Sequence, residues 1–98
     1  MSFPSPDPDE QLKPIEFDFA DRDLILDLWT IESDIESRFK LAPVKGKRIV
    51  VEMNAFDLDE LLGSIAAIAN HEKNAKRRRK LDDLFKRISD TLETQFPQ

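Results

Sequence analysis

The chain has 98 residues, enough for one domain with a modest core, and it carries a formal net charge of −5. It contains no cysteine, no tyrosine and one histidine. Disulfides, thiolate metal sites and a thiol nucleophile are therefore excluded, and few groups remain for acid–base catalysis. The longest weakly polar run, residues 61–69, is too short to cross a bilayer, and the start lacks the features of a secretory signal. We expect a soluble, cytoplasmic protein.

Charge is distributed unevenly along the chain. Residues 14–45 carry four basic and eight acidic side chains, whereas residues 73–98 carry eight basic and four acidic ones. Such a division is typical of a basic contact surface for another molecule, or of a basic helix matched internally by acidic neighbours. The acidic total argues against nucleic-acid binding by the whole molecule but leaves a local basic patch open.

Proline, serine and acidic residues dominate the start of the chain, and such a composition cannot bury enough apolar surface to offset its ordering entropy. We interpret residues 1–13 as a disordered N-terminal arm and residues 14–98 as a single α+β domain. The segment IEFDF alternates apolar and acidic side chains, which predicts a short strand with Ile15, Phe17 and Phe19 on its core side.

A helical pattern follows this strand. Asp21 can cap the helix, and the apolar residues recur at helical spacing at Leu24, Leu28, Ile31, Ile35 and Phe39. The residues from Ser33 to Glu36 also match a capping box, which would break the helix near Trp29 or Thr30. Residues 22–40 can therefore form one helix or two. Pro43 and Gly46 end this region.

A second strand is predicted over Lys47–Met53, with Ile49, Val51 and Met53 facing inward. We expect Asp57 to cap the next helix, with Glu60 completing the capping box. The buried stripe of that helix comprises Leu58, Leu61, Leu62, Ile65 and Ile68. Residues 58–62 also match an LxxLL docking pattern, which we attribute to core packing because the stripe already explains its leucines.

The apolar pattern lapses from Asn70 to Lys80 and resumes at Leu81, which favours two helices over one long helix. Asn70 suits the exit of the first helix and Asn74 the cap of the second. The predicted fold is α+β in the order β-α-β-α-α, with a short two-stranded sheet packed on helices and a helical hairpin at the end. The sequence leaves parallel and antiparallel pairing of the strands open.

The most prominent motif is the basic run of residues 76–80, KRRRK. Helical counting from Leu81 places Arg77 and Arg78 on the core-facing side, with their charged heads extended outward. Their favoured acceptors are carboxylates of residues 16–36, in the same chain or in a second copy. The alternative acceptor is nucleic-acid phosphate, although no aromatic residue lies among these bases for stacking.

The chain has one tryptophan, Trp29, and one histidine, His71. Trp29 is expected either in the core or as an interface anchor, because tryptophan is enriched at interfaces. His71 is expected in an exposed hairpin turn, since a metal site would need three or four converging ligands. Gly46 and Gly63 alone cannot build a phosphate-binding loop. We therefore predict no catalytic residue, no metal site and no cofactor.

The stretch LDELLGSIAAIANHEKNAKRRRKLDDLF resembles a group of small bacterial proteins and appended domains. In that group an apolar strand leads into a helix ending in AAxANH, and a lysine-rich helix follows. The resemblance covers roughly residues 20–92, including RDLIL and LAPVKGKRIVV, and Ile68 stands where the group has a glutamate. It implies a helical hairpin and assigns no activity and no catalytic or binding residue.

These patterns predict a non-enzymatic protein–protein interaction or accessory module. Two strands leave both edges of a sheet unpaired, so we expect a homodimer that closes one edge or covers apolar surface. The expected partner-binding residues are Trp29 together with the bases Arg77, Arg78, Arg79 and Lys80. A small nucleic-acid-binding regulator that uses residues 76–80 is the alternative, and we expect no membrane partner. Substrate turnover dependent on His71 would instead indicate an enzyme.

Overall fold

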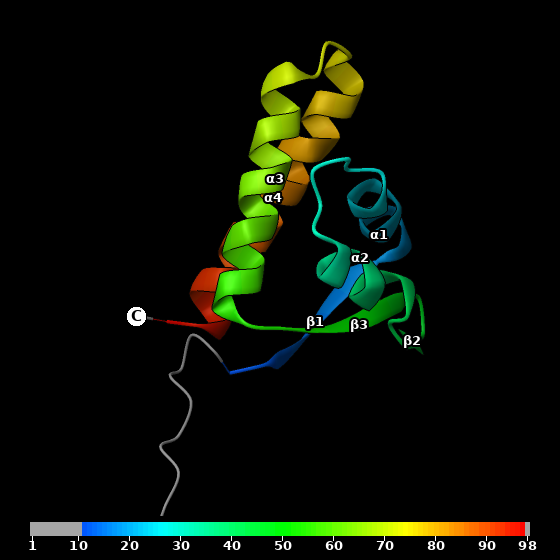
Figure 1. Cartoon of the computed structure of the whole chain (residues 1–98), viewed down its shortest axis with the longest axis vertical. Helices are drawn as coiled ribbons and strands as arrows, with labels where there is room; N and C mark the ends of the chain where they lie inside the picture. The colour runs from blue at the N-terminus through cyan, green and yellow to red at the C-terminus, as the bar shows by residue number, and fades with distance from the viewer. Residues whose placement is uncertain (1–10, 98) are drawn as a thin grey trace, which may run out of the picture.

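The computed structural model describes residues 11–97. These residues form an α+β fold in which four helices pack with a three-stranded antiparallel sheet, and the described chain ends in a helical hairpin (Figure 1). The elements are β1 (Lys13–Asp18), α1 (Phe19–Leu26), α2 (Ser33–Lys40), β2 (Val44–Lys45), β3 (Arg48–Met53), α3 (Ala55–His71) and α4 (Ala75–Gln95). The predicted arm lies outside the described residues as far as residue 10, and its last residue, Lys13, belongs to β1.

The sheet has one strand more than the sequence predicted. β3 lies in the centre and pairs antiparallel with β1 on one side and β2 on the other. β2 has only two residues, too few to show an alternating pattern, and a two-residue turn joins it to β3. Gly46 begins this turn with a φ of 64°, a positive value that suits glycine at the first position of a type II′ hairpin. The outer edge strand β1 carries Pro14, which has no amide hydrogen to donate.

One face of the sheet supplies its apolar residues to the core. Ile15 lies opposite Val51 and Phe17 opposite Ile49, and all four side chains are buried. The predicted inward position of Phe19 is wrong, because this residue begins α1 and is 37 % exposed. The strand ends one residue earlier because the Asp18 side chain accepts a hydrogen bond from the backbone N–H of Asp21 and so caps α1.

The predicted helix over residues 22–40 is two helices. α1 ends at Leu26, and α2 begins at Ser33 after a connection that contains Trp29 and Thr30. The buried Leu28 holds this connection against the core. Asp21 was expected to cap the first helix, but Asp18 takes that position, so the Asp21 carboxylate is available for an ion pair with α4.

Helix α3 begins three residues before the sequence indicated. The Asn54 side chain accepts from the N–H of Asp57, and the Asp57 carboxylate accepts from the N–H of Asn54. This reciprocal cap makes Asn54 the capping residue, whereas Asp57 occupies the third helical position instead of the cap. At its other end the helix includes Asn70 and His71, so the predicted turn is shorter than expected and spans Glu72 to Asn74.

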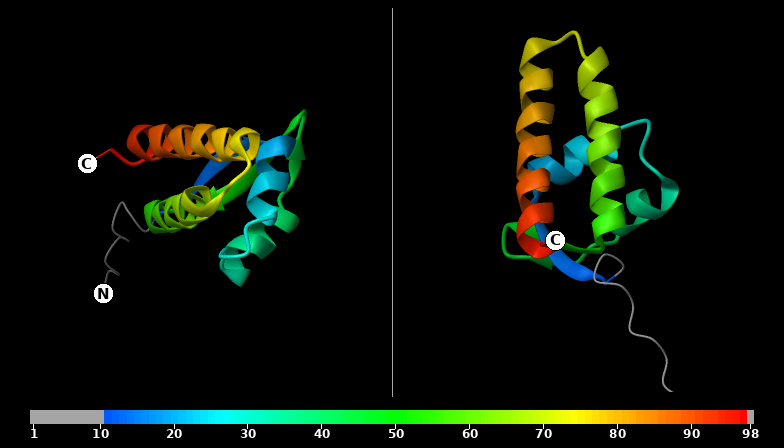
Figure 2. Two further views of the ribbon diagram at one scale, coloured as in Figure 1. Left: turned by 90° about the horizontal axis from the view of Figure 1, so that it is seen from above. Right: turned by 90° about the vertical axis from the view of Figure 1, so that its left-hand side faces the viewer.

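The hairpin formed by α3 and α4 is the longest part of the molecule. Figure 2 shows the two helices side by side, with α1 and α2 on one side of the pair. Its core positions agree with the predicted stripes, since each of the following is at most 2 % exposed: Leu58, Leu61, Ile65, Leu81, Leu84 and Ile88. The free tip of the hairpin extends beyond α1 and α2 (Figure 1).

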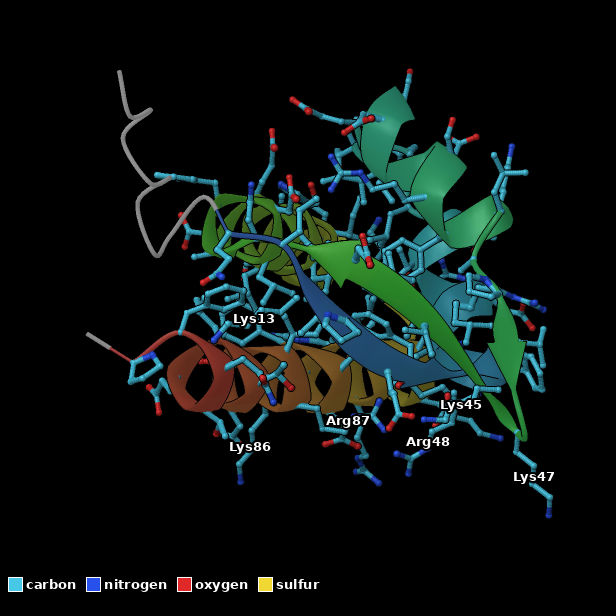
Figure 3. All side chains as sticks on the ribbon, turned by 90° about the horizontal axis from the view of Figure 1, so that it is seen from below. Lys13, Lys45, Lys47, Arg48, Lys86 and Arg87 are labelled. Carbon is cyan, nitrogen blue, oxygen red and sulfur yellow. The ribbon has the colours of Figure 1, made fainter. Side chains whose placement is uncertain are left out.

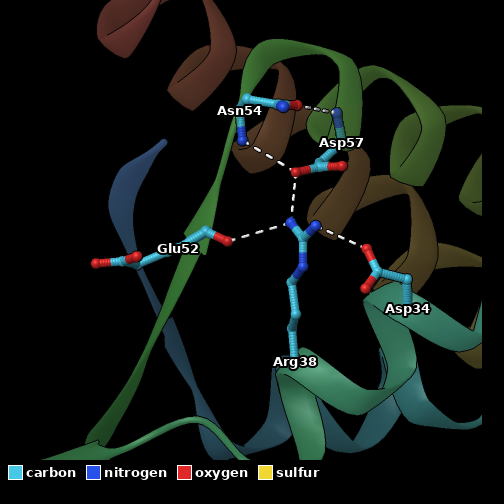
Figure 4. Close-up of polar contacts among 5 residues, drawn as sticks. All are labelled: Asp34, Arg38, Glu52, Asn54 and Asp57. Atoms are coloured by element: carbon cyan, nitrogen blue, oxygen red, sulfur yellow. Dashed lines mark hydrogen bonds and ion pairs between the residues drawn. The ribbon is translucent and has the colours of Figure 1, made fainter. Parts of the chain in front are cut away.

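Arg38 links its own helix, α2, to the end of β3 and the start of α3 (Figure 4). Its guanidinium lies 2.5 Å from an oxygen of Asp57 in α3 and 2.6 Å from one of Asp34, and it donates to the backbone carbonyl of Glu52 in β3. Burial lowers the pKa of Arg38, but the hydrogen bonds and charges of Asp57 and Asp34 together outweigh this effect and raise that pKa above its ordinary value. The guanidinium therefore stays charged and holds α2 against the start of α3.

Candidate interaction surface

Five basic side chains gather at the free end of the hairpin. Helix α4 begins at Ala75, and the following residues surround its first turns with exposed positive charge: Lys73, Lys76, Arg78, Arg79 and Lys80. We call these five residues the cationic tip. Within residues 11–97, none of the five has a carboxylate oxygen within 4.0 Å of its charged group. Eight other basic residues of this range do have a partner, which is a carboxylate or, for Lys13, a backbone carbonyl and an aromatic ring. The tip is a concentration of uncompensated charge.

Positive charge at this place is unfavourable for the helix itself. The first turn of a helix carries a positive partial charge and normally attracts acidic residues, yet the first turn of α4 contains no acid. Only Asn74 provides a cap, by accepting from the N–H of Arg77. Residues that break a local rule of stability in this way are candidates for a functional role.

Arg77 lies in the middle of the basic run but is not part of the tip. Its guanidinium is 2.6 Å from Asp27 at the end of α1 and 3.2 Å from Glu72. This contact confirms the predicted pairing with an acidic residue of the region 16–36 for Arg77. Arg78 has no such partner in the described part of the chain and is exposed, so pairing within one chain is not found for it, and pairing with a second copy stays a prediction.

Trp29 is 82 % exposed, so its predicted place in the core is wrong. It lies two residues after Asp27, the residue that binds Arg77, and therefore in the connection tied to the first turn of α4. A tryptophan that stays in water is unusual, because this side chain is highly buried on average and is enriched in binding hot spots together with arginine. Its role as an interface anchor stays a prediction.

A group of negatively charged side chains lies near the start of α3, at the opposite end of that helix from the cationic tip. Glu60 and its neighbour Asp59 are exposed near the start of that helix, and the Glu60 carboxyl is within hydrogen-bonding reach of Glu32, which precedes α2. We call Glu32, Asp59 and Glu60 the acidic cluster. No basic side chain among residues 11–97 forms an ion pair with any of the three.

This crowding of carboxyl groups has a measurable consequence. A hydrogen bond with Glu32, burial, and the charges of Glu32 and Asp57 together raise the pKa of Glu60 above its ordinary value. Glu60 therefore favours the folded state below its ordinary pKa, and that contribution is lost as pH rises through the raised value. We expect NMR titration of the side-chain carboxyl to show this elevated pKa, and Glu32→Gln to bring it closer to normal. An unchanged Glu60 titration in that variant would contradict the contact.

A further group of basic residues occupies the underside of the sheet and α4 (Figure 3). Most of these residues already have partners. Arg48 and Lys45 both approach Glu16, Arg87 lies 2.5 Å from Asp21, and Lys13 donates to the Gln95 carbonyl. Burial raises the pKa of Asp21, and the nearby charge of Arg87 opposes that effect. Because most of its charges are compensated in this way, the underside is a weaker candidate for an interaction surface than the cationic tip.

An open groove of about 760 Å³ lies between α1 and α4. Asp21 and Asp27 line it, but Arg87 and Arg77 already pair with these two carboxylates. His71 ends α3 on the exposed surface and is not among the residues that line the groove. Among residues 11–97, no three acidic or histidine side chains are placed to hold a metal ion, and none of the helices there is long and apolar enough to span a membrane.

The chain was compared with protein-family models, with curated proteins and with solved structures, and none of them matched. The candidate surface therefore rests on its own geometry. Sequence reasoning named Arg78, Arg79, Lys80 and Trp29 as partner-binding residues. It placed Lys76 in the basic run of residues 76–80 but counted neither Lys76 nor Lys73 among the partner-binding residues. It also missed the acidic cluster, because Glu32 and Glu60 are far apart in the sequence and only the packing of α2 beside α3 brings them together.

Proposed function

We propose that the protein is a non-enzymatic interaction module that binds an acidic protein surface through its cationic tip. The observation that carries the proposal is the set of five exposed bases without an ion-pair partner among residues 11–97, at a helix end that disfavours positive charge. A partner that supplies carboxylates would form the ion pairs that the chain itself leaves unmade. Trp29, near the same end of the molecule, would contribute apolar contact area.

The charge of the remaining chain favours a compact acidic partner over a nucleic acid. Residues 73–80 contain six bases and no acid, so with a net charge of −5 the other residues carry −11. A nucleic-acid duplex presents phosphates along its whole length and would extend from the tip towards this negative surface. An acidic protein segment can contact the tip alone. The electrostatic attraction for a negatively charged partner is therefore confined to the cationic tip, and a short protein segment rich in carboxylates fits that limited area.

The proposal predicts salt-sensitive binding of a fluorescently labelled oligoglutamate peptide, measured by fluorescence polarisation. Replacing both Arg78 and Arg79 by glutamine should weaken binding about tenfold, because two charge-assisted contacts are lost. The matched control replaces Lys47 and Lys86 by glutamine, since these bases are also exposed and without an ion-pair partner among the described residues, but lie away from the tip. This control removes the same charge and should retain binding.

Arg77→Gln provides a second comparison within the basic run. The charge of Arg77 is already compensated by Asp27 and Glu72, so we expect this variant to keep most of its peptide affinity. It should instead lose about 0.5–1 kcal/mol of stability, a small value because the pair is partly exposed. Equal loss of affinity in all three variants would refute a site at the tip. Tighter binding of a duplex oligonucleotide than of the peptide at physiological ionic strength would favour a nucleic-acid partner.

A further inference from the structure

The cationic tip and the acidic cluster lie at different heights on the same hairpin. The tip surrounds the end of α3 and the start of α4, whereas Asp59 and Glu60 lie near the start of α3. Glu60 and His71 are eleven helical steps apart, which is about 17 Å along the axis. Each group leaves its charges without a counter-charge among the described residues, and the two groups have opposite signs.

This arrangement is self-complementary under a two-fold rotation. If two hairpins lie antiparallel, the tip of each copy falls beside the acidic cluster of the other, and both contacts form together. A parallel arrangement would place like charges opposite one another. The charge layout of one chain therefore selects both its partner and the relative direction of the two hairpins.

We propose that the acidic surface bound by the cationic tip is the acidic cluster of a second copy of this chain, docked with its hairpin antiparallel. The inference rests on the proposed function and names its partner. Neutralisation of the acidic cluster by bases of the second copy would relieve the repulsion between Glu32 and Glu60.

The exposed face of α3 between the two charged groups is compatible with this contact. Phe56, at the acidic end of that face, is 59 % exposed and would be covered by the tip of the other copy. Gly63 and Ala67 lie at the middle of the face, where a two-fold axis would pass, and both are exposed. Apart from Gly63's own neighbours in the helix, no atom of residues 11–97 lies within 4 Å of the position that a Gly63 side chain would take, so none of these residues obstructs a second helix there.

The test is a charge-swap experiment followed by sedimentation equilibrium. The wild-type chain should dimerise at low ionic strength and dissociate at high ionic strength. A tip variant carries Arg78→Glu and Arg79→Glu, and a cluster variant carries Asp59→Lys and Glu60→Lys. Each variant alone should be monomeric, with its dissociation constant raised about a hundredfold, because like charges now meet. An equimolar mixture of the two should restore a dimer that contains one copy of each.

Circular dichroism of each variant establishes that it is folded, and all the substituted side chains are exposed. A dimer that survives in either variant alone would overturn the inference, since the interface would lie elsewhere. So would failure of the mixture to associate. If the wild type is monomeric but still binds oligoglutamate at the tip, the second copy is not the partner and the proposed function stands. If it neither dimerises nor binds the peptide, both proposals fail.

Discussion

Replacing Phe39 by alanine is expected to lower the free energy of unfolding by about 3–5 kcal/mol. Phe39 is 1 % exposed and lies against Phe17, with 4.9 Å between the ring centroids and an angle of 59° between the ring planes. The substitution would remove apolar contacts, leave a cavity, and abolish the only aromatic pair recorded among the described residues. Because small domains have total stabilities of about 5–15 kcal/mol, this loss is large enough to unfold part of the population.

Urea denaturation followed by far-ultraviolet circular dichroism measures the effect. Phe39→Leu is the matched control, because it keeps a large apolar side chain at the same position and should cost clearly less than alanine. Phe85→Ala provides a second control, since Phe85 is 36 % exposed and loses less buried surface. A loss below about 1 kcal/mol in Phe39→Ala would show that α2 does not hold the sheet in the way described.

The second large effect is expected at Arg38. Arg38→Met keeps much of the side-chain volume but removes the bonds to Asp57, Asp34 and the Glu52 carbonyl. The Asp57 side chain is only 15 % exposed, so its carboxylate would lose its cation in a place with limited access to water. We expect a loss of about 2 kcal/mol, at the middle of the range for hydrogen bonds to charged groups.

Asp34→Asn separates the two ion pairs of Arg38. Asp34 is largely exposed, so losing its charge should change stability by less than about 0.5 kcal/mol. Denaturation curves of the two variants, recorded under identical conditions, give the comparison. If Asp34→Asn costs as much as Arg38→Met, the exposed pair rather than the contact with Asp57 secures α2.

The residues that alternate or recur at helical spacing were predicted well, and the reason is physical. A strand or helix that buries one face must repeat apolar residues with its own period, so Ile49, Val51 and Met53 indicated β3, and Leu81, Leu84 and Ile88 indicated α4. The break between α1 and α2 was also visible as one of two alternatives. β2 escaped notice because its pairing depends on the turn at Gly46 and on the position of β3, not on a pattern of its own.

The candidate surface was predictable only in part. Counting from Leu81 assigned both Arg77 and Arg78 to the core side, yet only Arg77 meets α1. Arg78 lies seven residues before Phe85, two helical turns along the same flank, and that flank is partly exposed. Which flank α1 covers is a property of packing between elements. For the same reason the sequence could not show that Glu32 meets Glu60.

The edges of the sheet have a consequence for how copies of this chain can associate. One edge belongs to β1, where Pro14 offers no amide donor, and the other belongs to β2, which ends after two residues. Fibril growth needs a long row of free backbone donors and acceptors on which the next chain can hydrogen-bond, and both edges interrupt such a row. Aggregation into cross-β fibres is therefore disfavoured, and reversible assembly through side chains is the route that the fold leaves open.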